Sequence, residues 1–408
     1  MKYLIFMIYP ILLYAYPDFS GKVEAGLNSV LQKETPLGYY SKIELQIDGN
    51  IDNYGSFEAI AILKNSKGLN ELNVIKKKSI IGELFYLESG FSTGNDQLDE
   101  LITILTKMYE DGKLNNLLNS KTYPDDQIVL DRLLINLNTK YVDFRIGRQQ
   151  IAWGTGYAFN PTDIWNMKNP LDPMAPKLGV MAIKTEVPLG DISGADIVFS
   201  PGNDLRSSSY GLRVKSGFNS IDYSFSTVKN SLRKELGAED RVMFGIDVAG
   251  QIWDEGPGFW SESATNYIYK NNNFDVDSLE YKIDFGIDYT LDNGLYLMSE
   301  YLFNSLGAGS KNEYSYYSLL KTASGELSGF AEQYLFNGCS YSLNSDVKLS
   351  LYSLVNLNDS SFALLPEINY IYSENIEFKL NYIKNYGNYN TEYGSYEDSI
   401  SLIATAYF

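Results

Sequence analysis

The chain has 408 residues, among them 34 Tyr, 20 Phe and 33 Gly, with one cysteine and no histidine. Its 33 basic residues against 51 acidic ones give a formal net charge of −18, which argues against a nucleic-acid partner. Without histidine it lacks the usual base of hydrolytic enzymes and a common ligand of zinc, haem and copper, so we predict no enzyme activity, no cofactor and no metal site.

The chain begins with a short apolar run that is typical of a secretory signal peptide. Lys2 precedes apolar residues from Tyr3 to Leu13, and Ala15 offers a small residue for cleavage. A membrane-spanning helix needs about 20 apolar residues, so this run is too short to be one. We therefore expect residues 1–15 to be a signal peptide and residues 16–408 to form a single domain beyond the inner membrane.

Segments that alternate apolar and polar residues recur along the rest of the chain. The clearest runs from Tyr281 to Leu291, continues through the tight-turn sequence Asp292, Asn293, Gly294, and resumes at Leu295. Such short turns alternate with longer loops, a pattern of bacterial outer-membrane barrels. We count about 19 candidate strands, and an even number is required, so one of them is wrong. The doubtful ones are Phe259 to Ile268 and a weak pair between Tyr54 and Glu88.

The fold that we predict is all-β: a transmembrane antiparallel β-barrel of about 18 strands, with 16 as the next possibility. The last strand supports it, because Ile400, Leu402, Ala404 and Ala406 alternate with more polar residues and Phe408 ends the chain. This ending resembles that of bacterial outer-membrane barrels, in which a terminal Phe is an assembly signal. The resemblance implies that Phe408 is read by the barrel assembly machinery.

One segment departs from the two-residue period. From Asn95 to Tyr109 the apolar residues fall on one helical face, which predicts a short amphipathic helix in a long loop. Such a helix would either plug the lumen or only cover a hydrophobic patch on a neighbouring loop. Upstream, Lys76, Lys77 and Lys78 form a basic spot that would meet lipopolysaccharide phosphates if it is extracellular, although a solvated charge run is the simpler interpretation.

The most distinctive stretch is GRQQIAWGTGYAFNPTDIWNMKNPLDP, from Gly147 to Pro173. It resembles a segment of porin-like outer-membrane barrels in which a strand that ends in Gly-Arg-Gln and Trp-Gly leads into a loop with Asn-Pro and Asp repeats. Arg148 falls on the outward register of this strand, which is costly at the bilayer midplane. We therefore expect Arg148 at the rim, or a bulge at Gly147 that turns it inward.

The loop that follows this strand is rich in Pro, Asn and Asp, which form rigid turns. We predict that it bends into the channel as a constriction, with Arg145, Gln149, Trp153, Asp163 and Asp172 near its narrowest part. A rigid outer loop without pore contact is the alternative. Oxygen ligands between Asn271 and Asp277 lack the Gly and the distal Glu of a calcium loop, so no metal is assigned there.

The predicted register places about a dozen acidic and nine basic side chains in the lumen, which describes a wet interior. The acidic ones include Asp247, Asp284 and Glu300, and the basic ones include Arg213 and Lys215. Mixed signs argue against a strong ion filter, and an acidic excess in the loops favours cations weakly. The predicted function is therefore an outer-membrane porin-like channel for small hydrophilic solutes. The alternative is a plugged structural or adhesive barrel that acts through its extracellular loops. The predicted partners are outer-membrane lipid, lipopolysaccharide and the assembly machinery.

Overall fold

A computed structural model describes residues 17–31, 37–51, 54–67, 126–166, 171–173, 177, 179–231, 240–270, 273–314, 318, 322 and 327–408. Within these residues the chain forms eighteen β-strands and two short 3-10 helices, η3 (Lys311–Glu313) and η4 (Tyr393–Ser395). The strands are β1 (Pro17–Val30), β2 (Leu37–Ile51), β3 (Gly55–Lys67), β4 (Asp126–Asn138), β5 (Asp143–Gln149), β6 (Val180–Pro188), β7 (Gly194–Ser200), β8 (Ser209–Phe218), β9 (Ile221–Asn230), β10 (Arg241–Gln251), β11 (Gly258–Lys270), β12 (Asn273–Thr290), β13 (Tyr296–Asn304), β14 (Gln333–Ser342), β15 (Val347–Asn356), β16 (Ser361–Ser373), β17 (Ile376–Tyr386) and β18 (Ser399–Tyr407).

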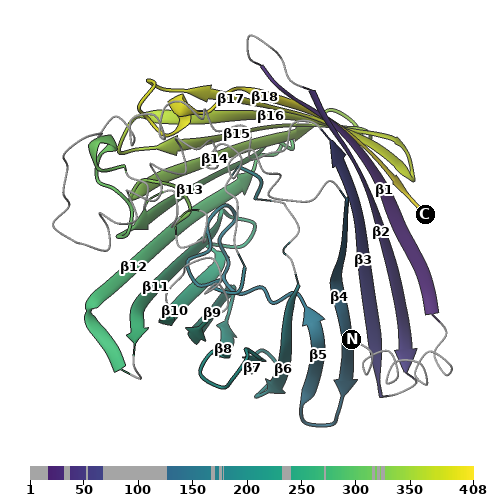
Figure 1. Ribbon diagram of the computed structural model, residues 1–408, viewed down its shortest axis with the longest axis vertical. Coiled ribbons are helices and arrows are strands. Elements are labelled where there is room, and N and C mark those ends of the chain that lie inside the picture. The colour runs from purple at the N-terminus through teal and green to yellow at the C-terminus, as the bar shows by residue number, and fades with distance from the viewer. Residues whose placement is uncertain are drawn as a thin grey trace, which may run out of the picture.

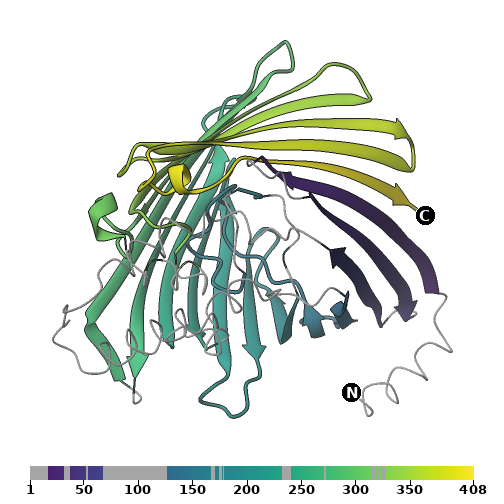
Figure 2. The same ribbon diagram turned by 45° about the horizontal axis from the view of Figure 1, so that its top comes forward.

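The eighteen strands close into one antiparallel barrel (Figure 1). Each strand pairs with the next along the chain, and β18 pairs with β1 to complete the ring. The carboxyl-terminal residue takes part in this closure. The backbone N–H of Phe408 donates to Gly21 O at 3.0 Å, and the N–H of Gly21 donates to Phe408 O at 2.9 Å. Figure 2 shows the carboxyl terminus beside β1.

The two ends of the barrel differ in the length of their connections. At the end where β1 begins and β18 finishes, all eight connections between the strands are two to six residues long. They include the turn predicted at Asp292 to Gly294, which lies in the connection between β12 and β13. The opposite end carries the longest connections, 68–125, 150–179, 305–332 and 387–398. We call these the short-turn end and the long-loop end.

Alternation along the strands sorts side chains between two environments. On β12 the residues Tyr281, Ile283, Phe285 and Ile287 are 37–50% exposed on the outer face, whereas Glu280 and Asp284 on the inner face are buried. The same outward apolar pattern recurs around the ring, at Leu212 and Val214 on β8 and at Phe244 and Ile246 on β10. A continuous apolar outer surface of this kind is stable in hydrocarbon rather than in water.

The predicted architecture and strand number are confirmed. Phe259 to Ile268, a doubtful candidate at the sequence level, lies within β11, and β3 accounts for the start of the other weak region. The predicted signal peptide (1–15), the basic spot at Lys76 to Lys78 and the predicted helix at Asn95 to Tyr109 lie outside the described residues. No helix in the described ranges is long and apolar enough to cross a membrane.

Candidate functional site

The segment that follows β5 runs into the interior of the barrel, and residues 150–166 pack against its inner wall (Figure 1). Trp153, Phe159 and Trp165 are at most 3% exposed there. Trp153 and Trp165 meet edge to face, with ring centroids 5.7 Å apart. Because a barrel wall presents only one residue layer to its interior, this segment, which we call the lumen loop, supplies the other half of an apolar core.

The lumen loop contacts a wide arc of the wall through two clusters of buried side chains. Trp153 and Trp165 pack on inward residues of β6, β7, β9, β10 and β11, namely Ala182, Val198, Val228, Met243 and Ala264. Ala158 and Phe159 pack farther round, on inward residues of β13 to β16, namely Met298, Leu302, Tyr334, Phe336, Leu354, Ala363 and Leu365. We call the arc from β6 to β16 the covered wall.

The covered wall has a glycine where the two indole rings approach it. A Cβ atom added at Gly211 on β8 would lie 2.6 Å from the Trp165 ring and 2.8 Å from the Trp153 ring. Both distances are shorter than van der Waals contact, so any side chain at this position would displace the loop. The absence of a side chain at Gly211 therefore makes room for the tryptophans.

Glu262 on β11 holds the first turn of the lumen loop. Its Oε1 accepts hydrogen bonds from the backbone N–H groups of Thr155 (2.5 Å) and Gly156 (2.6 Å). Its Oε2 accepts from the backbone N–H (3.0 Å) and the hydroxyl (2.9 Å) of Thr162. Gly154 adopts φ +83°, and a Cβ there would lie 2.6 Å from Oε1 of Glu262. The backbone can therefore wrap this carboxylate only because Gly154 lacks a side chain.

Glu300 on β13 holds the next residues in the same way. Its Oε2 accepts from the backbone N–H groups of Tyr157 (3.0 Å) and Ala158 (2.8 Å), and its Oε1 accepts from that of Phe159 (2.9 Å). Glu262 and Glu300 are 1% and 0% exposed. Charge-assisted hydrogen bonds of this kind are about twice as strong as neutral ones, which offsets the cost of burying the carboxylates. Together the two residues form what we call the carboxylate clamp.

The end of the lumen loop is tied by Asp163. Its carboxylate forms a salt bridge with Lys177 and accepts a hydrogen bond from Asn166 Nδ2 at 3.0 Å. Burial raises the pKa of Asp163, while the positive charge of Lys177 and the hydrogen bonds from Asn166 oppose that rise. Nearer the wall, the backbone N–H of Gly179 donates to Oδ1 of Asp131 on β4 at 3.0 Å. The loop is thus fixed at both ends as well as in its middle.

The rest of the inner wall, β17, β18 and β1 to β5, carries charge pairs that are partly exposed, and we call it the open wall. Glu44 lies 3.4 Å from Lys22 and 3.3 Å from Lys42, with side chains 17–25% exposed. Arg132 on β4 pairs with Glu58 on β3 at 2.9 Å, and both side chains are about a quarter exposed. These charge pairs on the open wall are therefore partly accessible, with both signs of charge interleaved.

The residues predicted from the sequence to line a constriction lie in different environments. Gln149, Trp153 and Asp163 are buried, so they shape the lumen loop rather than face open water. Asp172 is exposed. Arg145 points inward from β5, where its Nε donates to Asn136 Oδ1 at 2.8 Å.

The other predicted cations lie along the wall. Arg148 stays in the outward register, next to the last residue of β5 at the long-loop end, and its Nε donates to Asp131 O at 3.2 Å. Arg213 pairs with Asp247 at 3.0 Å, and the half-exposed Lys215 lies 3.8 Å from Asp196. The structure therefore does not gather these residues at one narrow point.

Sequence reasoning missed the carboxylate clamp. Glu300, Asp284 and Asp247 were expected to face a wet interior, but they are 0%, 0% and 2% exposed. They do point inward, but other groups cover them. The lumen loop covers Glu300, and the Arg213 and Ser224 side chains cover Asp247. Glu262 was missed because its strand was doubted. Inward glutamates opposite a long Gly-containing loop are the signal that would have pointed to them.

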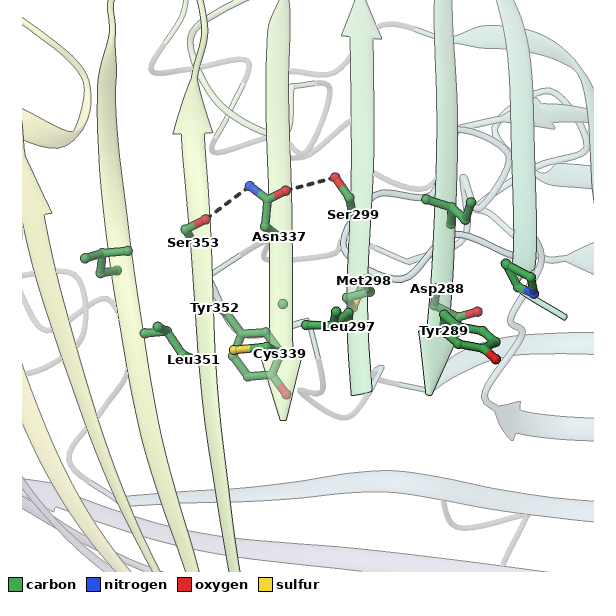
Figure 3. Close-up of a pocket in the computed structure, with 14 residues that line it drawn as sticks. Asp288, Tyr289, Leu297, Met298, Ser299, Asn337, Cys339, Leu351, Tyr352 and Ser353 are labelled. Carbon is green, nitrogen blue, oxygen red and sulfur yellow. Dashed lines mark hydrogen bonds between the residues drawn. The ribbon is translucent and has the colours of Figure 1, made fainter. Parts of the chain in front are cut away.

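A groove of about 550 Å³ lies on the outer face of the barrel, over β12 to β16 (Figure 3). Its floor carries a polar row in which the Ser299 hydroxyl donates to Asn337 Oδ1 at 2.8 Å and Asn337 Nδ2 donates to Ser353 Oγ at 3.2 Å. These residues alternate with inward residues that contact the lumen loop, so the groove opens to the apolar outside.

The barrel resembles solved structures of outer-membrane porins. OccK5 (OpdH) of Pseudomonas aeruginosa is 8% identical with a TM-score of 0.56, and the alignment covers 96% of this chain and 98% of that one. OccAB1 of Acinetobacter baumannii is 9% identical with a TM-score of 0.55 and 96% coverage of each chain. OccK8 (OprE) of Pseudomonas aeruginosa is 8% identical with a TM-score of 0.54, covering 96% of this chain and 98% of that one. The sequence matches no protein family and no curated protein. The likeness establishes a shared barrel fold.

Proposed function

We propose that this chain forms a porin-like channel in the bacterial outer membrane, through which small hydrophilic solutes diffuse. The observation that carries the proposal is the contrast between the two sides of the lumen. The lumen loop is buried against the covered wall by its apolar side chains and the carboxylate clamp, while the open wall keeps partly hydrated charge pairs such as Arg132–Glu58. A polar path along the open wall suits the passage of hydrated solutes, and we call this path the solute lane.

The strand number supports a lumen of useful width. Barrels of 16 to 18 strands leave an aqueous channel when nothing fills them. The lumen loop takes part of that space, so it acts in this proposal as the constriction. Buried residues such as Trp153 and Asp163 determine its position, and partly exposed loop residues such as Tyr157 and Asn160 are the ones available to meet solute.

The apolar outer surface supports the location. Outward residues around the ring suit hydrocarbon, and the shared fold of outer-membrane porins agrees with that surface. Phe408 remains our candidate for the signal to the assembly machinery, and lipid and lipopolysaccharide remain the proposed neighbours of the outer face. Residues 1–15 remain the proposed signal peptide.

The charges of the open wall support at most a weak ion preference. Lysine and arginine alternate there with glutamate, as in Lys22–Glu44–Lys42. We propose that the net acidic excess of the chain favours cations slightly, more at low salt, because screening shortens the range of such fields. A reversal potential that reports anion preference would contradict this part.

Single-channel recording in a planar bilayer tests the proposal. We expect stable conductance from the purified full chain, and a larger conductance after deletion of residues 158–174, because the deletion removes the second half of the lumen loop. A matched deletion of residues 201–206, in another connection at the long-loop end, should leave conductance unchanged. No conductance from a correctly folded, heat-modifiable barrel would favour the plugged structural barrel instead. Unchanged conductance in the 158–174 deletion would reject the constriction alone.

A further inference from the structure

Two connections and two strand ends at the long-loop end meet at one buried carboxylate, that of Glu392. Glu392 lies in the 387–398 connection and is 4% exposed. Its Oε2 accepts hydrogen bonds from the Tyr334 hydroxyl at 2.6 Å and from Asn356 Nδ2 at 2.7 Å. Its Oε1 accepts from the backbone N–H of Phe330, in the 305–332 connection, at 3.2 Å. The Glu392 side chain thus joins its own connection to the end of the 305–332 connection, the start of β14 and the end of β15.

A second carboxylate, Asp359 in the 357–360 connection, extends the network. The backbone N–H of Glu392 donates to its Oδ2 at 2.7 Å, and the Tyr314 hydroxyl donates to the same atom at 2.9 Å. Asn356 Nδ2 also donates to the Tyr314 hydroxyl at 2.7 Å. We name this network the loop clasp, and its members are Tyr314, Phe330, Tyr334, Asn356, Asp359 and Glu392.

The charged and titratable groups around Glu392 are anionic or phenolic. Asp359 faces it from 357–360, Tyr314 from 305–332, Tyr334 from β14, and Tyr393 and Tyr396 from its own connection. Among the residues that the structure describes, no salt bridge joins Glu392 or Asp359 to a lysine or arginine. Lys311, in the same region, donates to Asn390 at 3.2 Å instead. Within the described part of the chain, the clasp therefore buries a carboxyl group beside another carboxylate without a compensating cation.

We propose that the loop clasp is a proton-operated fastening, which holds the three connections together most firmly when Glu392 is protonated and loosens when Glu392 ionises. Ionised Glu392 must remain in a buried site beside Asp359, and separating the connections would return it to water. Protonated Glu392 is neutral, so its burial beside Asp359 carries no such electrostatic cost. This inference concerns the long-loop end of the barrel and goes beyond the proposed channel function.

The direction of the pH dependence follows from linkage. Burial raises the pKa of Glu392 from 4.5 to about 7, the hydrogen bonds from Tyr334 and Asn356 oppose the rise, and the charge of Asp359 adds to it. Because the pKa is higher in the joined state than in water, joining is favoured most below pH 4.5 and loses that advantage as the pH rises through about 7. The equilibrium between joined and separated connections changes about tenfold per pH unit in that window, so by about 10²-fold or more in all.

Amide hydrogen exchange of the full barrel in bilayer nanodiscs tests the proposal without reference to conduction. The backbone N–H groups of Phe330 and Glu392 both donate within the clasp, so their exchange reports its opening. After correction for the intrinsic exchange rate at each pH, we expect protection at these amides to fall about 10²-fold between pH 5 and pH 8.5, with a midpoint near pH 6, between the pKa of 4.5 in water and the pKa of about 7 in the clasp. Unchanged protection across that range would overturn the proposal.

Two variants sharpen the test. Glu392→Gln is neutral at every pH, so protection should lose its pH dependence. Its NH₂ group is brought against the donors of the clasp, so protection should also be lower than in the unmodified chain at acidic pH. Asp359→Asn removes the neighbouring charge while keeping an acceptor oxygen, so the midpoint should move to lower pH. Glu397→Gln, in the same connection, is the matched control and should behave as the unmodified chain. A pH dependence that survives in Glu392→Gln would assign the transition to another group and reject the proposal. If Glu392→Gln does not fold, the shift in Asp359→Asn decides.

Discussion

Inward glutamates have different environments and different roles on the covered wall and on the open wall. Glu300 on β13 and Glu44 on β2 both point inward, yet Glu300 is fully buried and accepts three backbone N–H groups, whereas Glu44 is 18% exposed and pairs with Lys22 and Lys42. What differs is the layer above them. Where the lumen loop lies on the wall, inward carboxylates anchor polypeptide. Where the lumen loop does not cover the wall, they form partly exposed charge pairs that face the proposed solute lane.

The largest effect that we expect comes from replacing the buried carboxylate of Glu300 on the covered wall. Glu300→Gln removes the charge that three buried N–H groups share and brings an NH₂ group against them. We expect a loss of about 2–4 kcal/mol in the free energy of unfolding, together with larger or noisier single-channel currents as the lumen loop shifts. Urea titration in bilayers and single-channel recording measure the two.

The matched substitution on the open wall is Glu44→Gln. A partly exposed ion pair contributes little, so this change should cost less than about 1 kcal/mol and leave the current noise unaltered. Equal losses for Glu300→Gln and Glu44→Gln would remove the distinction between the walls.

The next largest effect is expected at Gly211 on the covered wall, where the lack of a side chain leaves space for Trp153 and Trp165. Gly211→Ala places a methyl group against the rings of Trp153 and Trp165, so we expect a loss of about 1–3 kcal/mol and altered conductance. Gly190→Ala is the control, because a Cβ atom there meets nothing closer than 3.9 Å. If the two variants unfold at the same urea concentration, the indole pair is not pressed against β8.

A smaller effect is expected from removing a cation on the open wall. Arg132→Gln leaves Glu58 without its partner at 2.9 Å and exposes a negative charge to the lane. The free energy of unfolding should change by less than about 1 kcal/mol, because both groups are partly hydrated. Cation permeability relative to anions should rise by about twofold at low salt and less at high salt. Reversal potentials measure it, and a shift toward anions would show that this pair does not face the lane.

Much of the fold could be predicted because successive residues of a barrel strand face hydrocarbon and the barrel interior in turn, so the sequence alternates between apolar and polar residues. The alternation along Tyr281 to Leu291 sets the inward and outward faces of β12 without reference to the rest of the chain. Tight turns such as Asp292 to Gly294 set the strand ends in the same local way. Phe259 to Ile268 was doubtful because Ser261, Ser263 and Thr265 occupy outward positions there, so the apolar alternation is weak even though the segment is a strand.

The candidate site was harder to predict because its chemistry depends on what covers each side chain. Register alone gives Glu300 and Glu44 the same orientation. It cannot show that Tyr157, Ala158 and Phe159 will place their N–H groups on Glu300, since 141 residues or more separate the partners. For the same reason Trp153 and Asp163 were expected at the narrowest part of a pore, although both are buried in the packing of the lumen loop.

The smallest effect is expected on the outer face, where neither wall is involved. Asn337→Leu removes the polar row with Ser299 and Ser353 and replaces an amide with an apolar group in the outer groove (Figure 3). Loss of two hydrogen bonds and gain of contact with hydrocarbon oppose each other, so the free energy of unfolding should change by less than about 1 kcal/mol. Conductance should not change, because Asn337 is on the side of β14 opposite Phe336, which packs in the cluster under the lumen loop. A changed conductance in this variant would mean that the strands transmit outer substitutions to the loop, and the contrast between the walls would then owe less to local contacts than we infer.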